Sequence, residues 1–235
     1  MTEQNNAQFD SGCLICGAPL VYFDEAKPME CMVCHKKFMA TCACEKEHFV
    51  CNRCHSQLNP EYMDMLRAST EKDPMVLLQR AMESPGIHMN GPEHHPMVPC
   101  VLLTAYRNCG GELNYPSAMK EAFRRGQLVP GGACGYGGVC GAMIGAGIYG
   151  SLILGGTPVK EGPWAKVQEL TARIIKRIAE IGGVRCCKRT THIAIEEAVA
   201  WTREVTGIEI PLAPHPCTFY DQNRECMFAD CPYFE

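Results

Sequence analysis

Eight cysteines in the first sixty residues have the spacing of metal ligands. They form four close pairs: Cys13/Cys16, Cys31/Cys34, Cys42/Cys44 and Cys51/Cys54. Two thiolates on one tight turn can both reach an ion at roughly 2.3 Å, and two such turns complete a tetrahedron. Gly17, directly after Cys16, permits the turn that directs backbone N–H groups at the sulfurs. The sequence therefore predicts two zinc sites in a zinc-ribbon-like module.

The pairing of these ligands is open, because spacing does not fix connectivity. In the simpler arrangement Cys13, Cys16, Cys31 and Cys34 form one site, and Cys42, Cys44, Cys51 and Cys54 form the other. In an interleaved, cross-brace arrangement the pairs alternate between the sites. His35, His48 and His55 lie nearby and can each replace a cysteine, although we expect them at the surface or behind the ligands. Four thiolates suit zinc or an iron–sulfur cluster.

Four further cysteines are candidate catalytic residues. Cys134 and Cys140 flank a glycine-rich stretch, and Cys186 and Cys187 lie in the basic run 185–189, before a helix expected from Thr190. A helix N-terminus and nearby cations both stabilise a thiolate. We therefore expect lowered pKa values for these thiols, which either exchange disulfides or hold an iron–sulfur cluster.

A third set of residues comprises candidate cofactor ligands: Cys109, Cys217, Cys226, Cys231, His94 and His95. Cys109 precedes a glycine pair that exposes the end of a helix. The two histidines belong to a turn-rich loop over 88–96, in which Glu93 can orient an imidazole. The last three cysteines lie in a proline-containing tail, which needs a metal, a cluster or packed aromatic residues to be ordered.

The glycine-rich stretch 131–154 must be distinguished from two other structures. Gly135 and Gly137 begin a dinucleotide fingerprint, but Cys140 takes the third glycine position and no strand precedes the motif. The apolar run from Val139 to Leu154 is shorter than the roughly 20 residues of a spanning helix. We predict a buried helix whose glycines allow another helix, or a bound group, to approach its backbone.

The elements that position these residues are mainly helices. Apolar residues recur at helical spacing over 74–82, 98–108, 164–181 and 193–205, and strand-like alternation is scarce after residue 60. We therefore predict a mainly α fold: a metal-knuckle module at 1–60, then an α-helical bundle domain at 61–235 that ends in an irregular, cysteine-rich tail.

Composition and charge limit the cellular compartments and the kinds of partner that we expect for this protein. The 235 residues include 17 cysteines, 46% are hydrophobic and the net charge is -4. This charge does not favour nucleic acid as a partner. The N-terminus shows no secretory signal, so we expect a cytoplasmic protein without a membrane anchor, whose cysteines bind metal or carry redox chemistry. A protein partner or a small thiol or sulfur substrate fits this composition.

Two resemblances follow from the cysteine motifs. The stretch CGAMIGAGIYGSLILG, with Cys109 before it and Cys186 after it, is similar to the motif helix of the C-GCAxxG-C-C family of small, helical, redox-active proteins. The wider pattern over 85–235, with Arg185-Cys-Cys-Lys-Arg189 and Cys231-Pro-Tyr-Phe234, resembles an uncharacterised domain family of anaerobic prokaryotes. Some members of that family are joined to methyltransferase-like domains.

Two functions fit these observations. The first is a metal- and thiol-dependent redox or sulfur-handling protein, with structural zinc in the N-terminal module and an iron–sulfur cluster or a reactive thiol site in the helical domain. The alternative is a non-enzymatic, metal-stabilised adaptor for a partner enzyme such as a methyltransferase, because the sequence has no complete set of nucleophile, base and oxyanion donors. Whether the protein is an enzyme is left open.

Overall fold

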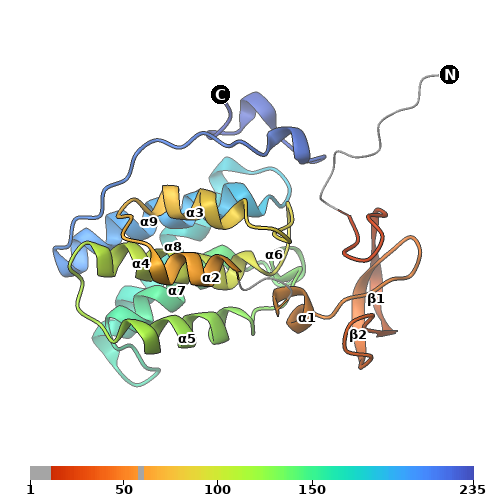
Figure 1. Cartoon of the computed structure of the whole chain (residues 1–235), viewed down its shortest axis with the longest axis horizontal. Helices are drawn as coiled ribbons and strands as arrows, with labels where there is room; N and C mark the ends of the chain where they lie inside the picture. Colours follow the sequence, from red (N-terminus) through yellow and green to blue (C-terminus); the bar gives the residue numbers. More distant parts are fainter. Residues whose placement is uncertain (1–11, 58–60) are drawn as a thin grey trace.

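The computed structural model describes residues 12–57 and 61–235. A hairpin and a short helix form the N-terminal module, which lies at one end of a bundle of helices (Figure 1). The expected end of the module at Pro60, like the first eleven residues, lies outside the described residues. Within the described ranges no helix has the length and apolar character needed to cross a membrane.

The N-terminal module is built on two antiparallel strands, β1 (Leu20–Glu30) and β2 (Lys37–Cys44). Leu20 pairs with Cys44 at one end of the hairpin and Glu30 with Lys37 at the other, with an irregularity in the register between Tyr22 and Lys27. Helix α1 (Asn52–Gln57) follows. The hairpin has little apolar core, so something other than packing must hold the flanking loops.

The remaining helices form the bundle. They are α2 (Glu61–Ala68), α3 (Pro74–Met82), α4 (His94–Asn108), α5 (Tyr115–Gly126), α6 (Ala133–Tyr136), α7 (Gly141–Ile153), α8 (Glu161–Ile181) and α9 (Cys187–Thr206). Helix α3 begins as its sequence predicts, since Asp73 Oδ1 accepts a 2.8 Å hydrogen bond from Met75 N and Pro74 occupies the first turn. The prediction of a mainly helical chain is confirmed.

Helices α4 and α7 form the centre of the bundle. The glycines of α7 permit this contact: a Cβ at Gly145 would lie 2.8 Å from the carbonyl oxygen of His95, and one at Gly141 would overlap the His95 ring. The predicted close approach to this backbone is therefore that of another helix. One continuous core joins α2 to α9 and includes Phe219 and Tyr233 of the tail.

Two helices begin earlier than the sequence predicts. Helix α4 begins at His94, so His94 and His95 belong to its first turn and are not in a loop. Helix α9 begins at Cys187, with Cys186 as its N-cap, and not near Thr190. In both places polar residues that usually favour turns are buried against neighbouring helices, and this tertiary contact outweighs local propensity.

The tail after α9 is irregular, as predicted, but it is closely packed. It runs back along the outside of the bundle towards α3 (Figure 1) and includes two short 3-10 turns, Tyr220–Gln222 and Phe228–Asp230. Thr218 accepts a 2.8 Å hydrogen bond from Gln79 of α3, and Tyr233 donates one of 2.9 Å to Glu196 of α9. These contacts bring the cysteines of the tail back to the start of α9.

Candidate metal centres

The first centre is a complete four-ligand set at the open end of the hairpin. Cys13, Cys16, Cys44 and His48 place one ligand atom each within 4.8 Å of all the others. The Sγ atoms of Cys16 and Cys44 are 3.9 Å apart, and His48 Nδ1 lies 3.2 Å from Cys16 Sγ. Two sulfurs bound to one tetrahedral zinc at roughly 2.3 Å are separated by about 3.8 Å. The set therefore fits one zinc ion.

The local backbone supports these ligands as the sequence predicts. Gly17 has a φ of +69°, which closes the loop after Cys16 in a conformation that other residues rarely adopt. Ile15 N donates to Cys13 Sγ at 3.3 Å, and His48 N donates to Cys44 Sγ at 3.2 Å. Such N–H groups stabilise thiolates and fix their direction.

The second centre lies at the other end of the hairpin. Cys31, Cys34, Cys51 and Cys54 also have their sulfurs within 4.8 Å of one another, and the Sγ atoms of Cys34 and Cys51 are 3.9 Å apart. Burial opposes the ionisation of Cys31, but N–H groups of residues 51, 34 and 33 donate to its sulfur and lower its pKa to about 6. Burial, together with the three other thiols, raises the pKa of Cys54. The pKa values of Cys31 and Cys54 are thus shifted in opposite directions. A bound cation would allow all four cysteines to be thiolates together.

The two centres are interleaved, so the simpler pairing predicted from the sequence is wrong. The reason is the antiparallel hairpin. Pairing of Leu20 with Cys44 brings 13–16 beside 44–48, whereas Cys31 follows the last residue of β1 at the far end. Cys31 also bridges to Phe49, which leads 51–54 to that end. The cross-brace alternative describes the arrangement.

Cys42 does not belong to either ligand set. His48 has the ligand position that was predicted for Cys42. Cys42 pairs with Tyr22 inside the hairpin, two residues before Cys44. Its sulfur does not lie within 4.8 Å of all the ligand atoms in the set that Cys44 joins. Burial raises the pKa of Cys42, and Tyr22 lies 5.1 Å below the guanidinium of Arg185. His48 therefore has a ligand position, not the surface role expected of it.

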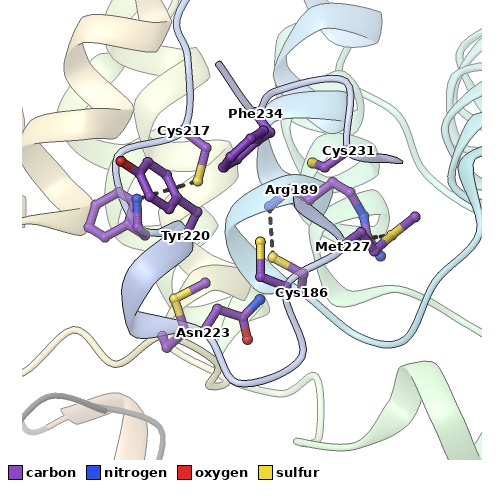
Figure 2. Close-up of a pocket in the computed structure, with 11 residues that line it drawn as sticks. Cys186, Arg189, Cys217, Tyr220, Asn223, Met227, Cys231 and Phe234 are labelled. Atoms are coloured by element: carbon purple, nitrogen blue, oxygen red, sulfur yellow. Dashed lines mark hydrogen bonds between the residues drawn. The ribbon is translucent and has the colours of Figure 1, made fainter. Parts of the chain in front are cut away.

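A third group of cysteines lines a pocket between α9 and the tail. Cys186, Cys217, Cys226 and Cys231 surround it together with Arg189 and mainly apolar side chains. Figure 2 shows Cys186, Cys217 and Cys231 on different sides of this space. Burial, followed by the neighbouring Cys186, Cys231 and Cys226, raises the pKa of Cys217 to about 11. The structure thus brings the three predicted tail residues to one predicted catalytic residue.

Cys187, which is partly buried, interacts with buried Cys140 in a different group. Cys187 is the first residue of α9, and its N–H donates to Asn90 Oδ1 at 2.8 Å. Cys140 is the N-cap of α7 and is 7% exposed. Burial raises the pKa of Cys187 to about 12, and negative charge on Glu93 and Cys140 raises it further. The expected lowering by cationic neighbours is wrong here and at Cys186, because burial outweighs those charges.

Glu93 links the N-terminal module to the bundle. This carboxylate is 3% exposed, its Oε2 lies 3.0 Å from Nδ1 of His55, and its Oε1 accepts a 3.0 Å hydrogen bond from the backbone N–H of His88. Burial opposes its ionisation, yet contacts with His55 and His88 hold its pKa well below the usual range. His55 directly follows the metal-ligand position Cys54, so the second centre is tied to the bundle.

His94 and His95 are buried and are held as neutral imidazoles. Nδ1 of His94 donates to Gly91 O and Nδ1 of His95 donates to Val129 O, each at 3.1 Å. Burial, with the charge of Lys188 next, lowers the pKa of His94 to about 3. Neither residue belongs to a ligand set among the described residues. Their predicted role as cofactor ligands stays a prediction.

Lys188 is a feature that the sequence analysis did not find. Its side chain is 1% exposed, and its Nζ lies 4.5 Å from the centre of the Phe219 ring. Burial lowers its pKa to about 8. The run Cys-Cys-Lys-Arg shows in the sequence that positive charge is present. It does not show that this charge is buried, because the burial depends on the packing of the tail on α9.

Two other predicted residues lie apart from these groups. Cys134 is exposed in the short helix α6, and Cys109 is half-buried at the end of α4. Burial raises the pKa of Cys109. Neither cysteine joins a four-ligand set within the described ranges, and their roles stay predictions.

Residues 63–234 match the model of a family of unknown function (DUF5714). The chain belongs to this family. The DUF5714 region includes the bundle helices from the third residue of α2 onward and the tail as far as Phe234, whereas both metal-ligand sets of the N-terminal module precede it. The comparison with curated proteins and that with solved structures found no match. The four-cysteine pocket is therefore part of the family region.

Proposed function

We propose that this protein is a metal- and thiol-dependent redox or sulfur-handling protein whose N-terminal module is held by two structural zinc ions. The observation that carries the proposal is the pair of complete four-ligand sets in a module with almost no other core. Closed sets of four cysteine and histidine ligands are typical of structural zinc.

The zinc assignment is supported by what is buried around the ligands. The satellite core of the module consists of Cys31, Cys51 and Cys54, with Phe49 and Val50 packed beside them. So few apolar side chains cannot fold a module of this size, and metal binding supplies the missing free energy. The Cys3His composition of the first set favours zinc over an iron–sulfur cluster at that position.

The redox or sulfur-handling role is supported by the grouping of cysteines in the bundle. Cys140 and Cys186 are the N-caps of α7 and α9, and Cys187 begins α9. Burial raises the pKa of the free thiols of Cys186 and Cys187, but the helix dipole and free N–H groups at such positions would stabilise the anionic sulfurs of a bound cluster. The resemblance of the α7 sequence to a redox-active family agrees with this role.

Metal and sulfide analysis of anaerobically purified protein tests the proposal. We expect two zinc ions per chain, together with either iron and labile sulfide or two or more thiols that oxidise and reduce reversibly under mild conditions. Zinc-free protein with a folded N-terminal module would contradict the structural assignment. Iron-free protein whose thiols resist mild oxidation would contradict the redox role.

An adaptor role is the second candidate, and exposed apolar side chains on the module favour it. Met39 is 66% exposed, and Val21, Met32 and Val33 are each more than 40% exposed. Partner surfaces often contain such residues. The Met39→Ser variant should lose a partner captured from the native cell extract, whereas Val159→Ser, which changes the 91% exposed Val159 on the bundle, should keep it. Equal capture by both variants would remove the support of this surface for an adaptor.

A further inference from the structure

The pocket between α9 and the tail has the features of a ligand site. Its four cysteines come from distant parts of the chain: Cys186 caps α9, whereas Cys217, Cys226 and Cys231 belong to the tail. Phe234 packs edge-on against the rings of Tyr220 and Phe228, at 5.1 and 5.7 Å between centres. Figure 2 shows Phe234 beside Cys217 and Cys231. Aromatic and thioether side chains thus surround the sulfurs and limit the access of water.

Backbone N–H groups are directed at three of the sulfurs. Phe219 N lies 3.5 Å from Cys217 Sγ, Phe228 N lies 3.3 Å from Cys226 Sγ, and Arg189 N lies 3.4 Å from Cys186 Sγ. The same donation occurs at Cys13 and Cys44 of the first zinc set. Neutral thiols gain little from such donors, whereas thiolates bound to metal are stabilised and tuned by them.

The four sulfurs are not gathered as closely as the ligands of a single metal ion. Among the described residues, sets with ligand atoms all within 4.8 Å of one another occur only in the N-terminal module. The four sulfurs of this pocket are therefore further apart than the ligands of one zinc ion. In an iron–sulfur cube each thiolate binds a different corner, so its ligands are spread more widely than those of a single ion.

Positive charge lies beside the pocket and would favour a bound anion. Lys188 is 1% exposed, its Nζ has no hydrogen-bond acceptor, and it pairs with no carboxylate within 4.0 Å among the described residues. Its Nζ lies over the ring of Phe219, which itself lines the pocket, and the negative charge of buried Glu93 also acts on it. Arg189 lines the pocket as well. Burying a cation costs several kcal/mol unless negative charge offsets it, and a cluster with four thiolates would add net negative charge to that of Glu93.

We propose that Cys186, Cys217, Cys226 and Cys231 bind a [4Fe–4S] cluster whose negative charge is balanced by Lys188 and Arg189. This inference rests on the proposed redox function and names the centre that performs it. About 360 Å³ inside the ring of side chains is free of protein atoms, part of it open to solvent. The pocket is narrow, so side chains that line it must shift when the cluster enters.

The test uses the full chain, purified without oxygen and reconstituted with iron and sulfide. We expect about four iron and four sulfide ions per chain, brown colour, and an electron paramagnetic resonance signal after reduction with dithionite. Cys217→Ala and Cys226→Ala should each lose the colour and most of the iron while keeping two zinc ions and the helical circular dichroism spectrum. Cys134→Ala, which removes an exposed cysteine outside the pocket, should keep the iron.

A charge variant tests the site even where a ligand variant does not fold. Lys188→Met removes a positive charge beside the cluster, which should lower the reduction potential and leave the iron content unchanged. An unchanged potential would contradict the assigned role of Lys188.

Three outcomes would overturn the inference, and they separate it from the proposed function. Iron that survives in Cys217→Ala but is lost in Cys140→Ala or Cys187→Ala places the cluster elsewhere and leaves the redox function intact. A third zinc ion lost in Cys217→Ala assigns the pocket to a single ion. A protein with two zinc ions, no iron and unreactive thiols contradicts both the cluster and the redox function.

Discussion

The most informative residues are those whose type alone does not reveal their role. Cys42 and Cys44 are separated by one residue, yet only Cys44 reaches a ligand set, because Cys42 faces Tyr22 inside the hairpin. His48 has a ligand position that an equally plausible cysteine was expected to fill. Sequence spacing identifies the ligand types, whereas the hairpin register selects among them.

Substitution of Cys44 and of Cys42 should therefore have different effects on zinc content. Cys44→Ser removes a ligand of the first set and should reduce bound zinc from two ions to one, while Cys42→Ser should keep both. Zinc released on thiol modification, measured with a chromogenic chelator, gives the count. Loss of one zinc ion in both variants would show that the observed grouping is wrong.

The buried imidazole of His94 should make the stability of the bundle depend on pH. Its pKa is about 3 in the folded protein because of burial, against about 6.5 in the unfolded chain. Between these values the unfolded state binds one more proton, so the free energy of unfolding falls as the pH falls. Between pH 7 and pH 5.5 the titration of His94 should lower the free energy of unfolding by about 1 kcal/mol.

His94→Asn is the matched variant for this prediction, since its amide can still donate to Gly91 O. Urea unfolding at the two pH values should show a loss about 1 kcal/mol smaller in the variant than in the wild type. Equal losses would mean that His94 is not held neutral by burial. Metal ligands that titrate in this range affect the wild type and the variant alike, so their contribution cancels when the two losses of stability are compared.

At the scale of elements, the sequence predicts the helices better than their contacts. Helix α8 ends at Ile181 with Gly182 as its C-cap, and α3 begins after Asp73, as local capping and periodicity indicate. The start of α4 is missed because His94 and His95 look like loop residues until α7 and 126–129 cover them. The spacing of apolar residues indicates which face of a helix is buried, but it does not indicate which other element packs against that face.

The contact between α4 and α7 can be tested with two glycine substitutions. Gly145→Ala places a Cβ 2.8 Å from His95 O and should destabilise the bundle by about 1–3 kcal/mol. Gly162→Ala in α8 meets nothing within 4 Å and should be neutral or stabilising by up to about 1 kcal/mol. Thermal unfolding of both variants checks the prediction. Stabilisation by both substitutions would mean that α7 does not approach α4 this closely.

At the scale of the whole molecule, candidate metal ligands and apolar packing dominate different parts of the chain. The bundle has one continuous core, whereas the module has two sets of candidate metal ligands and touches the bundle through Glu93 and His55. The sequence predicts this contrast, because cysteine pairs stop where helical periodicity begins. It does not predict that the tail cysteines meet Cys186, since the tail has no periodic pattern that would indicate its path.

Removal of zinc should consequently unfold one part of the chain and spare the other. A strong chelator should abolish hydrogen-exchange protection in β1 and β2, because the module loses the ions that replace a core. Protection in α4 and α7 should persist, since their core contains no zinc ligand. Parallel loss of protection in both parts would mean that the bundle depends on the module for its fold.

The most direct test of the whole account is native mass spectrometry of the anaerobically purified full chain. We predict a species with the mass of the chain plus two zinc ions and one [4Fe–4S] cluster, from which acid removes all three centres. A chain that carries two zinc ions and no iron after anaerobic reconstitution would contradict the central claim that the four-cysteine pocket holds an iron–sulfur cluster.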